Sequence, residues 1–157
     1  IPSCDGIIGG PPCQAWSEGG KQLGFEDPRG QLFLEYIRIV NLKKPKFFVI
    51  ENVQGILEDK HKQSLTFIIE SLRSIGYSIS YQLLNAGDFR IPQDRLRVFF
   101  VGIRNDLQST FDFPNSMPGK KVTLREAIGD IIENIDERSK TKIERRIRRI
   151  LKRMERD

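Results

Sequence analysis

One cysteine, one glutamate and a pair of arginines are the residues of this sequence whose types and settings point to chemistry. Cys13 follows a glycine and proline turn at residues 9–12, which leaves an apolar stretch abruptly because glycine permits unusual backbone angles and proline fixes φ. The turn therefore presents the thiol as a candidate nucleophile. Glu51 ends a second apolar stretch and offers a carboxylate, and Arg95 and Arg97 lead into a third and offer fixed positive charge.

Each of these groups also has an ordinary structural interpretation. Free cysteines are commonly small apolar components of a core. A glutamate at a strand end often caps a turn or forms a salt bridge, and arginines at alternating positions of a strand are often surface charges. The order and spacing of the groups along the chain favour the chemical interpretation over three separate structural ones.

The elements around Cys13 and Glu51 have the pattern of a βαβ unit. We expect an apolar strand at residues 4–8, a helix at residues 31–42 from its apolar spacing, and a second strand at residues 46–50 that leads into Glu51. A crossover of this kind joins parallel strands. Cys13 and Glu51 are then expected just past the carboxyl ends of neighbouring strands, at the edge where open α/β sheets bind ligands.

The rest of the chain predicts further elements of an α/β fold. These are a helix at residues 65–75 ended by Gly76, strands at residues 77–84 and 98–103, and a helix opened by a capping box of Thr123 and Glu126. Between the first strand and the first helix, residues 13–30 are polar and glycine-rich. A loop of this length without structure of its own is typical of a mobile functional lid.

The net charge of +5 is concentrated at the end of the chain. Residues 136–157 hold ten Lys and Arg against five Asp and Glu, so residues 1–135 are neutral overall. Ile143, Ile147 and Met154 fall on one stripe with arginines around it, which predicts a basic amphipathic helix. Packing of this helix on its own domain or on a partner is favoured over a dedicated contact with nucleic acid or a membrane.

The totals indicate one soluble domain. The chain of 157 residues has the length of one domain, and it carries neither a signal peptide nor an apolar run long enough to span a membrane. Cys4 and Cys13, nine positions apart, match no disulfide framework and no zinc spacing, so we expect an intracellular, reduced compartment and no metal. The chain begins at Ile1, almost directly in a strand, which suggests that a preceding segment is missing.

Three motifs in order carry a resemblance to a known family. Pro12-Cys13-Gln14, Glu51-Asn52-Val53 and Gln93-x-Arg95-x-Arg97 resemble the motifs of the cytosine-C5 DNA methyltransferases. The flanking Trp16-Ser17-Glu18-Gly19-Gly20 and Asp27-Pro28-Arg29-Gly30 are similar to bacterial restriction-modification enzymes of the HaeIII type. The resemblance covers about residues 3–132. It implies a partial Rossmann-like methyltransferase sheet, with a catalytic segment at residues 1–133 and a basic helical tail at residues 134–157.

The resemblance also implies roles for single residues. Cys13 is expected to add to carbon 6 of a flipped-out cytosine in double-stranded DNA, and Glu51 to hydrogen-bond N3 and the exocyclic amine of the base. Arg97, with Arg95, is expected to contact the base carbonyl and the adjacent backbone. S-adenosylmethionine would supply the methyl group, with Pro12 in contact with it.

The resemblance places a further set of side chains on the substrate side of this site. These are Gln14, Ser17, Asn52 and Gln93. Within the set, Asn52 is expected to hold its turn and Gln93 to support its loop, and the loop at residues 15–29 is expected to close over the flipped base.

The chain departs from the family pattern in three respects. The glycine-rich cofactor motif, the acidic residue expected on the ribose and the sequence-recognition domain find no counterpart in this sequence. We therefore interpret the chain as a fragment, as one subunit that needs a second chain, or as a decayed gene, in the bacterial cytosol near the nucleoid. The alternative of a different class is an inactive remnant that binds nucleic acid or a partner through its basic tail; an RNA-methylating relative is a third interpretation, which the loop around Trp16 disfavours.

Overall fold

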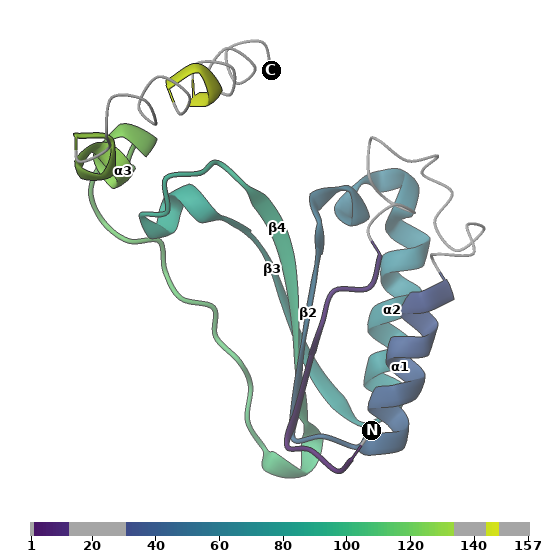
Figure 1. Cartoon of the computed structure of the whole chain (residues 1–157). Coiled ribbons are helices and arrows are strands. Elements are labelled where there is room, and N and C mark those ends of the chain that lie inside the picture. The colour runs from purple at the N-terminus through teal and green to yellow at the C-terminus, as the bar shows by residue number, and fades with distance from the viewer. Residues whose placement is uncertain (1, 13–30, 134–143, 148–157) are drawn as a thin grey trace.

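The computed structural model describes residues 2–12, 31–133 and 144–147. The described strands form one sheet with the order β1-β2-β4-β3. The strands are β1 (Gly6–Gly9), β2 (Phe47–Val53), β3 (Tyr77–Asn85) and β4 (Leu96–Arg104), and the α-helices are α1 (Gln31–Lys43), α2 (Lys62–Ser74) and α3 (Leu124–Glu133). This arrangement confirms the α/β class (Figure 1).

The first two strands confirm the βαβ prediction. β1 and β2 pair in parallel, and Gly9 opposite Ile50 is their last pair. The sequence prediction ended the second strand before Glu51, but β2 continues to Val53 because β4 pairs with it antiparallel along its whole length. Glu51 is therefore held inside a strand, one residue beyond the end of the parallel pairing, and is not on a loose turn.

The antiparallel hairpin of β3 and β4 makes the sheet mixed. β4 lies between β2 and β3, so the strand that comes last in the chain occupies a central position. Its apolar run from Val98 to Val101 suits that position, because a strand with a partner on each side lies inside the sheet, and Val98, Phe100 and Val101 are buried. Polar Ser78, Ser80 and Gln82 alternate along β3, as expected for an edge strand.

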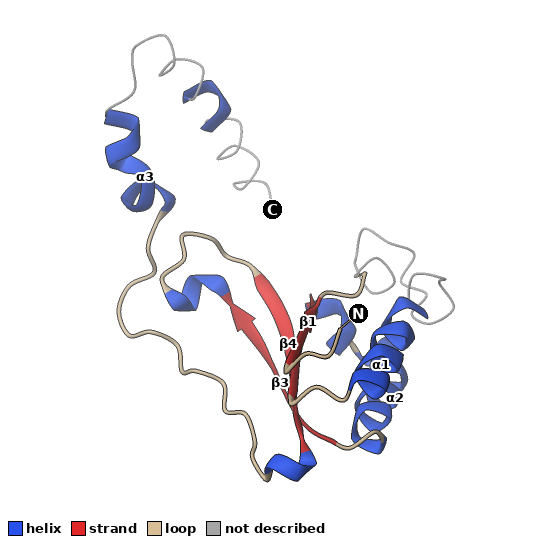
Figure 2. Cartoon of the chain, turned by 60° about the horizontal axis from the view of Figure 1, so that its bottom comes forward, coloured by secondary structure: helices blue, strands red, loops and turns tan. Residues whose placement is uncertain are grey.

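Both long helices cover the same face of the sheet. Figure 1 and Figure 2 show α1 and α2 side by side on one side of the strands, while residues 105–123 run along the other side. The core between the helices and the sheet is one cluster of buried apolar residues, among them Phe33, Ile37, Val40, Phe48, Ile50, Ile68, Leu72, Val98 and Phe100. The helical spacing in the sequence thus marked the faces that meet the sheet.

The helix ends follow the signals in the sequence. α1 ends at Lys43, and Lys44 takes a left-handed φ of 46° before Pro45. Gly76, with φ of 95°, ends the α2 turn, a conformation that glycine adopts without strain. At the start of α3 the predicted capping box is formed, because Glu126 N–H donates to Thr123 Oγ1 at 3.2 Å and Thr123 N–H donates to a Glu126 oxygen at 2.7 Å.

Of the basic tail, the structure describes only residues 144–147, which are helical. The remainder of the tail lies outside the described residues, so the amphipathic basic helix stays a prediction.

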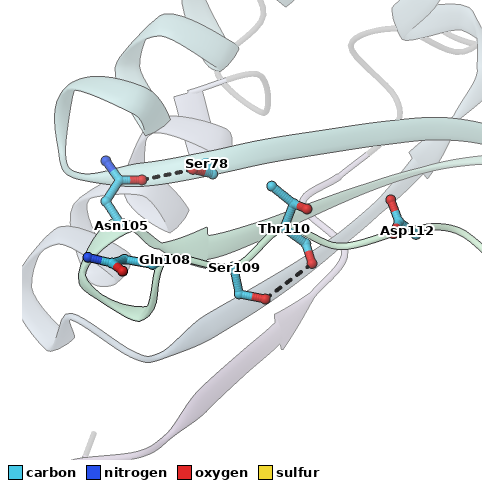
Figure 3. Close-up of a pocket in the computed structure, with 6 residues that line it drawn as sticks. All are labelled: Ser78, Asn105, Gln108, Ser109, Thr110 and Asp112. Atoms are coloured by element: carbon cyan, nitrogen blue, oxygen red, sulfur yellow. Dashed lines mark hydrogen bonds between the residues drawn. The ribbon is translucent and has the colours of Figure 1, made fainter.

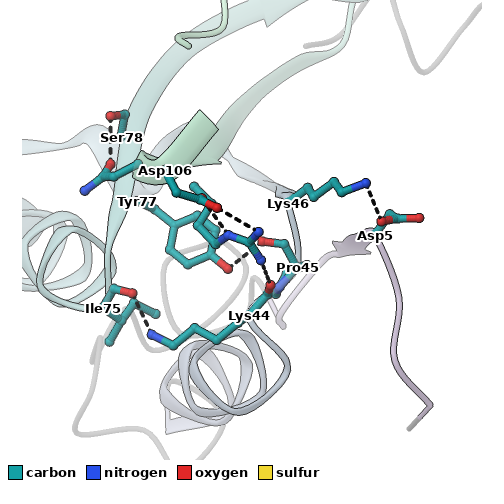
Figure 4. Close-up of polar contacts among 10 residues, drawn as sticks. Asp5, Lys44, Pro45, Lys46, Ile75, Tyr77, Ser78 and Asp106 are labelled. Carbon is teal, nitrogen blue, oxygen red and sulfur yellow. Dashed lines mark hydrogen bonds and ion pairs between the residues drawn. The ribbon is translucent and has the colours of Figure 1, made fainter. Parts of the chain in front are cut away.

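A set of polar contacts closes the end of the sheet at which β2 begins (Figure 4). The Tyr77 hydroxyl donates to the Pro45 carbonyl at 2.7 Å, and Lys44 Nζ donates to the Ile75 carbonyl at 2.8 Å. Arg104 binds Asp106 at 2.7 Å and also donates to the Lys44 carbonyl. These contacts tie the end of α1 to the turn between α2 and β3, and they leave the opposite end of the sheet for chemistry.

The close packing of β4 on β2 predicts a strict requirement at Gly102. A Cβ built there would lie 2.1 Å from Cε1 of Phe48, whose side chain is fully buried and has no room to retreat. We expect Gly102→Ala to lower the free energy of unfolding by about 1–3 kcal/mol, the usual cost of overpacking a core. Urea denaturation followed by circular dichroism measures the change.

The matched control is Gly129→Ala in α3, where a Cβ would meet no atom within 4 Å. Alanine suits a helix interior better than glycine by about 0.5–1 kcal/mol, so this variant should not lose stability. Equal stability of Gly102→Ala and the parent chain would contradict the packing argument.

His61, the only histidine of the chain, is buried at the start of α2 with 4% of its surface exposed. Its Nε2 has no hydrogen-bond partner among the described residues. Burial lowers the pKa of His61 below its ordinary 6.5, and the charge of Lys60 lowers it further against the opposing effect of Glu58.

This lowered pKa predicts a pH-dependent stability. The unfolded chain binds a proton at His61 more readily than the folded chain, so this contribution to stability is present above about pH 6.5 and is lost as the pH falls below that value. The free energy of unfolding, measured by urea between pH 8 and pH 5.5, should therefore decrease towards the acid end. His61→Gln should remove that slope, and an unchanged slope in the variant would assign it to other groups.

Candidate active site

The centre of the site is an ion pair between neighbouring strands. Glu51 lies opposite Phe99 and Arg97 lies opposite Val53, so both side chains project from the same face of β2 and β4. Arg97 Nε and Glu51 Oε1 are 2.8 Å apart, and the side chains are 23% and 40% exposed. Arg97 Nη1 also donates to the Leu96 carbonyl at 2.7 Å. The predicted carboxylate and one predicted arginine are thus brought together and oriented.

The pair lines a pocket of about 350 Å³. Arg95 also lines it, and its walls are formed mainly by the apolar side chains of Leu84, Phe89, Ile91, Phe99 and Pro114. An apolar wall keeps the local dielectric low and strengthens the attraction between the charges at its rim. In the sequence, the one signal of this apolar wall is the pair of Phe89 and Ile91 in an otherwise polar turn.

The turn that leads to Cys13 lies directly beside Glu51. A Cβ built on Gly10 would be 3.5 Å from Glu51 Oε2, so the second carboxylate oxygen faces the glycine and proline turn. Pro12, the predicted cofactor contact, is half-buried in this turn. Cys13, Gln14 and Ser17, with the whole loop at residues 13–30, lie outside the described residues.

Asn52 fastens this turn to β2. Its side chain is only 1% exposed, its Nδ2 donates to the Pro11 carbonyl at 3.2 Å, and its Oδ1 accepts from the Val53 N–H at 2.9 Å. Both functional groups of the side-chain amide are therefore engaged with the backbone. These contacts connect the turn to β2, and a role of Asn52 on the substrate side stays a prediction.

Asn85 organises the turn that carries the arginines. Its Oδ1 accepts from the N–H groups of Gly87 and Arg95 at 3.0 and 3.1 Å, and its Nδ2 donates to Asp94 at 3.2 Å. Lys121, from the segment after β4, binds the same Asp94 oxygen at 2.8 Å, and this hydrogen bond lowers the pKa of Asp94. The sequence analysis noted neither Asn85 nor Lys121 as a site residue. Gln93 is exposed at the edge of this turn.

A second, larger pocket lies at the other end of the sheet (Figure 3). It has a volume of about 640 Å³ and is lined by the polar side chains of Ser78, Asn105, Gln108, Ser109, Thr110 and Asp112. Ser78 Oγ donates to Asn105 Oδ1 at 3.0 Å across it. Ser78 lies near the start of β3 and pairs with Ile103 near the end of β4. Arg97 lies near the start of β4, so this pocket is remote from the Glu51–Arg97 pair.

The part of the chain that the structure describes was compared with the requirements of a metal site and of a membrane-spanning helix. Those residues contain no group of three or more His, Cys, Asp or Glu side chains that would hold a metal ion. They also contain no helix with the length and apolarity needed to cross a membrane.

Comparison with known proteins identifies the family. The model of the C-5 cytosine-specific DNA methylase family matches residues 1–156. The chain belongs to this family. Members of the C-5 DNA methyltransferase family use S-adenosylmethionine as methyl donor.

Individual relatives agree with this C-5 methylase assignment. The chain is 50% identical over 133 residues to the type II methyltransferase M.MthTI of Methanothermobacter thermautotrophicus, and 48% identical over 136 residues to M.FnuDI of Fusobacterium nucleatum. Each alignment covers 85% of this chain but only 40% of the relative. The chain therefore spans less than half the length of these type II methyltransferases.

Solved structures share the C-5 methylase fold. A protein of an Escherichia coli prophage, described as a DNA modification methyltransferase, aligns with a TM-score of 0.64 and 31% identity over 79% of this chain and 34% of its own. Spodoptera frugiperda DNMT2 aligns with a TM-score of 0.53 and 28% identity over 76% of this chain and 37% of its own.

The contacts of Asn52 lead to a test of the turn that precedes Cys13. Asn52→Ala leaves the Pro11 carbonyl and the Val53 N–H without these partners, and we expect it to cost about 1–3 kcal/mol of unfolding free energy. Asn41→Ala, which changes an exposed side chain on α1, should cost less than about 0.5 kcal/mol. Urea denaturation measures the loss of unfolding free energy in both variants. Equal losses would contradict the inference that the contacts of Asn52 stabilise the turn.

Proposed function

We propose that this chain is the catalytic segment of a DNA cytosine-C5 methyltransferase of a restriction-modification system. The observation that carries the proposal is the Glu51–Arg97 pair at 2.8 Å, placed at a pocket and beside the turn that precedes Cys13. Residues 1–133 would carry the reaction on double-stranded DNA, and residues 134–157 would form the basic tail.

The proposed reaction begins with Cys13. Carbon 5 of cytosine is a poor nucleophile, and addition of the Cys13 thiolate to carbon 6 pushes electron density into the ring. S-adenosylmethionine, when bound, would supply the methyl group for carbon 5. Carbon 5 then loses its proton to a base, the electron pair of that bond restores the double bond between carbons 5 and 6, and the Cys13 sulfur leaves carbon 6 with the electron pair of the carbon–sulfur bond. The target base has to leave the duplex stack first, at a cost of a few kcal/mol.

Glu51 would stabilise the ring while the thiolate adds. Its carboxyl group would hydrogen-bond N3 and the exocyclic amine, so that N3 carries a proton as negative charge develops on the ring. The proximity of Glu51 Oε2 to Gly10 supports this role, because it turns one carboxylate oxygen towards the segment that ends in Cys13.

The arginines would bind the other edge of the base and the backbone. Arg97 is held by Glu51 and by the Leu96 carbonyl, so its guanidinium is oriented before a ligand arrives. Arg97 would contact the base carbonyl, and Arg95, at the pocket rim, would contact adjacent phosphate. Asn52 and Gln93 would support the two turns.

The described residues offer little of a cofactor site. Pro12 is the one predicted contact, and neither of the two pockets described above includes it. These residues alone therefore do not form a site that fits S-adenosylmethionine. Since the relatives are more than twice as long, an activity test has to supply the remaining segments as a second polypeptide.

A covalent trap tests the proposal. The full chain, alone and together with the remaining segments of M.MthTI as a separate polypeptide, is incubated with S-adenosylmethionine and random-sequence duplex DNA that carries 5-fluorocytosine. Fluorine replaces the proton that must leave carbon 5, so the enzyme should stay attached to the base. We expect a denaturation-resistant complex on a gel in the mixture.

Two cysteine variants interpret the trap. Cys13→Ser should abolish the complex, whereas Cys4→Ser, which changes the half-buried cysteine before β1, should keep it. Absence of a complex from every mixture, with DNA still bound in a strongly salt-dependent manner, would reject the enzymatic proposal in favour of a nucleic-acid-binding remnant.

A further inference from the structure

One side chain of α1 reaches both parallel strands below the candidate site. The Tyr36 hydroxyl lies 3.2 Å from the Ile7 carbonyl of β1 and 3.1 Å from the Val49 carbonyl of β2. The Tyr36 hydroxyl oxygen therefore lies between the two strands, and its single proton can be donated to either carbonyl. The ring packs edge-to-face on Phe48 with centroids 6.2 Å apart, which fixes the side chain from a second direction.

The same ring also packs against the start of the turn. A Cβ built on Gly9 would lie 2.6 Å from Tyr36 Cε2, so only a residue without a side chain fits between the ring and the strand. Gly9 is the last residue of β1, three positions before Pro12. Tyr36 therefore contacts β1 at two points on the approach to the turn.

Tyr36 contacts both strands that lead to the proposed catalytic residues, β1 before Cys13 and β2 before Glu51. Val49 is two residues before Glu51 on β2, and Ile7 is six residues before Cys13. The contacts of Tyr36 thus lie on the final stretch of each strand before its proposed catalytic residue. Asn52 makes a second connection between the same two segments nearer the site, through the Pro11 carbonyl.

The hydroxyl is a permanent donor at this place. Burial raises the pKa of Tyr36 above its ordinary value of 10.0, so the hydroxyl keeps its proton and donates at neutral pH. In the sequence, Tyr36 follows the helical spacing of the apolar residues around it, so no local pattern distinguishes it from them.

We propose that Tyr36 is a positioning residue, which sets the separation of β1 and β2 and so holds the turn before Cys13 at a fixed place beside Glu51. This inference rests on the proposed function for its catalytic consequence. A shift of the turn by an ångström would separate the nucleophile from the carboxyl group and slow the chemical step. Arg95 and Arg97, the proposed contacts to the base and the DNA backbone, would keep their places at the start of β4.

The test compares two tyrosine-to-phenylalanine variants that lose the same kind of bond. Tyr36→Phe removes the hydroxyl between the strands, and Tyr77→Phe removes a buried hydroxyl that donates to the Pro45 carbonyl at 2.7 Å, at the opposite end of the sheet. Because each variant loses one hydroxyl hydrogen bond to a backbone carbonyl, the two should lose similar amounts of unfolding free energy. The two variants can therefore be compared at similar stability, and the test depends on other measurements.

Two readouts separate the variants. Native-state hydrogen exchange of the amides at residues 7–10 should become about tenfold faster in Tyr36→Phe than in Tyr77→Phe. In the completed methyltransferase, kcat should fall about tenfold in Tyr36→Phe with KM for DNA unchanged, and kcat of Tyr77→Phe should stay within about twofold of the parent.

The outcomes are distinct. Equal exchange at residues 7–10 in the two variants overturns the proposal, and so does an unchanged kcat in Tyr36→Phe. If the parent mixture transfers no methyl group at all, the proposed function fails, and the exchange comparison by itself then supports or rejects the role of Tyr36 in holding β1 to β2.

Discussion

The antiparallel register of β4 on β2 is the constraint on which the candidate site depends. β1 is short and its parallel pairing with β2 ends at Ile50, so a sheet of these two strands alone would leave Glu51 on a free end. β4 continues the pairing through Val53 and places Arg97 diagonally opposite Glu51 on the same face. The carboxylate and the guanidinium thus meet because backbone hydrogen bonds fix both of them, and the ion pair follows from the register and does not cause it.

Glycines allow this register to bring the strands and helices close. Gly102 lies opposite Phe48 and Gly6 lies opposite Phe47, and in each case the aromatic ring covers the glycine. A side chain at either position would collide with the ring within 3 Å. Gly9 gives the same room to Tyr36. Neighbouring aromatic rings, among them the buried Phe48 and the exposed Phe47, therefore leave room only for glycine at these strand positions. The turn before Cys13 begins at one of these close contacts.

The sequence was sufficient for the βαβ unit and the helix ends. These depend on local signals, such as the apolar spacing of α1, Gly76 after α2 and the capping box of Thr123. It was not sufficient for the order of the strands, because β4 pairs with β2 across the intervening α2 and β3. The contrast between the apolar run of β4 and the polar alternation of β3 holds that information, but only when the two strands are compared with each other.

The same limit applies to the site. Glu51, Arg95 and Arg97 could be named as candidates from their positions beside apolar stretches. Tyr36 and Lys121 act through contacts with residues at least 13 positions away in the chain, and Asn85 acts through contacts across its own turn. Tyr36 has the spacing of a core residue and Lys121 that of a surface charge, and neither pattern reveals a hydrogen bond to a distant strand or turn. Residues that support a site are therefore harder to read from sequence than residues that occupy it.

The exposure of the Glu51–Arg97 pair bears on what it can do. With 40% and 23% of their side chains exposed, the two groups keep contact with solvent, and ion pairs of this kind contribute about 0–1 kcal/mol to stability. The fold thus loses little when the pair opens. A pair that is positioned by the register but weakly bound suits a site in which both groups must turn to a ligand, because the geometry persists while the charges exchange partners. A buried pair with the same distance would hold the fold together and resist that exchange.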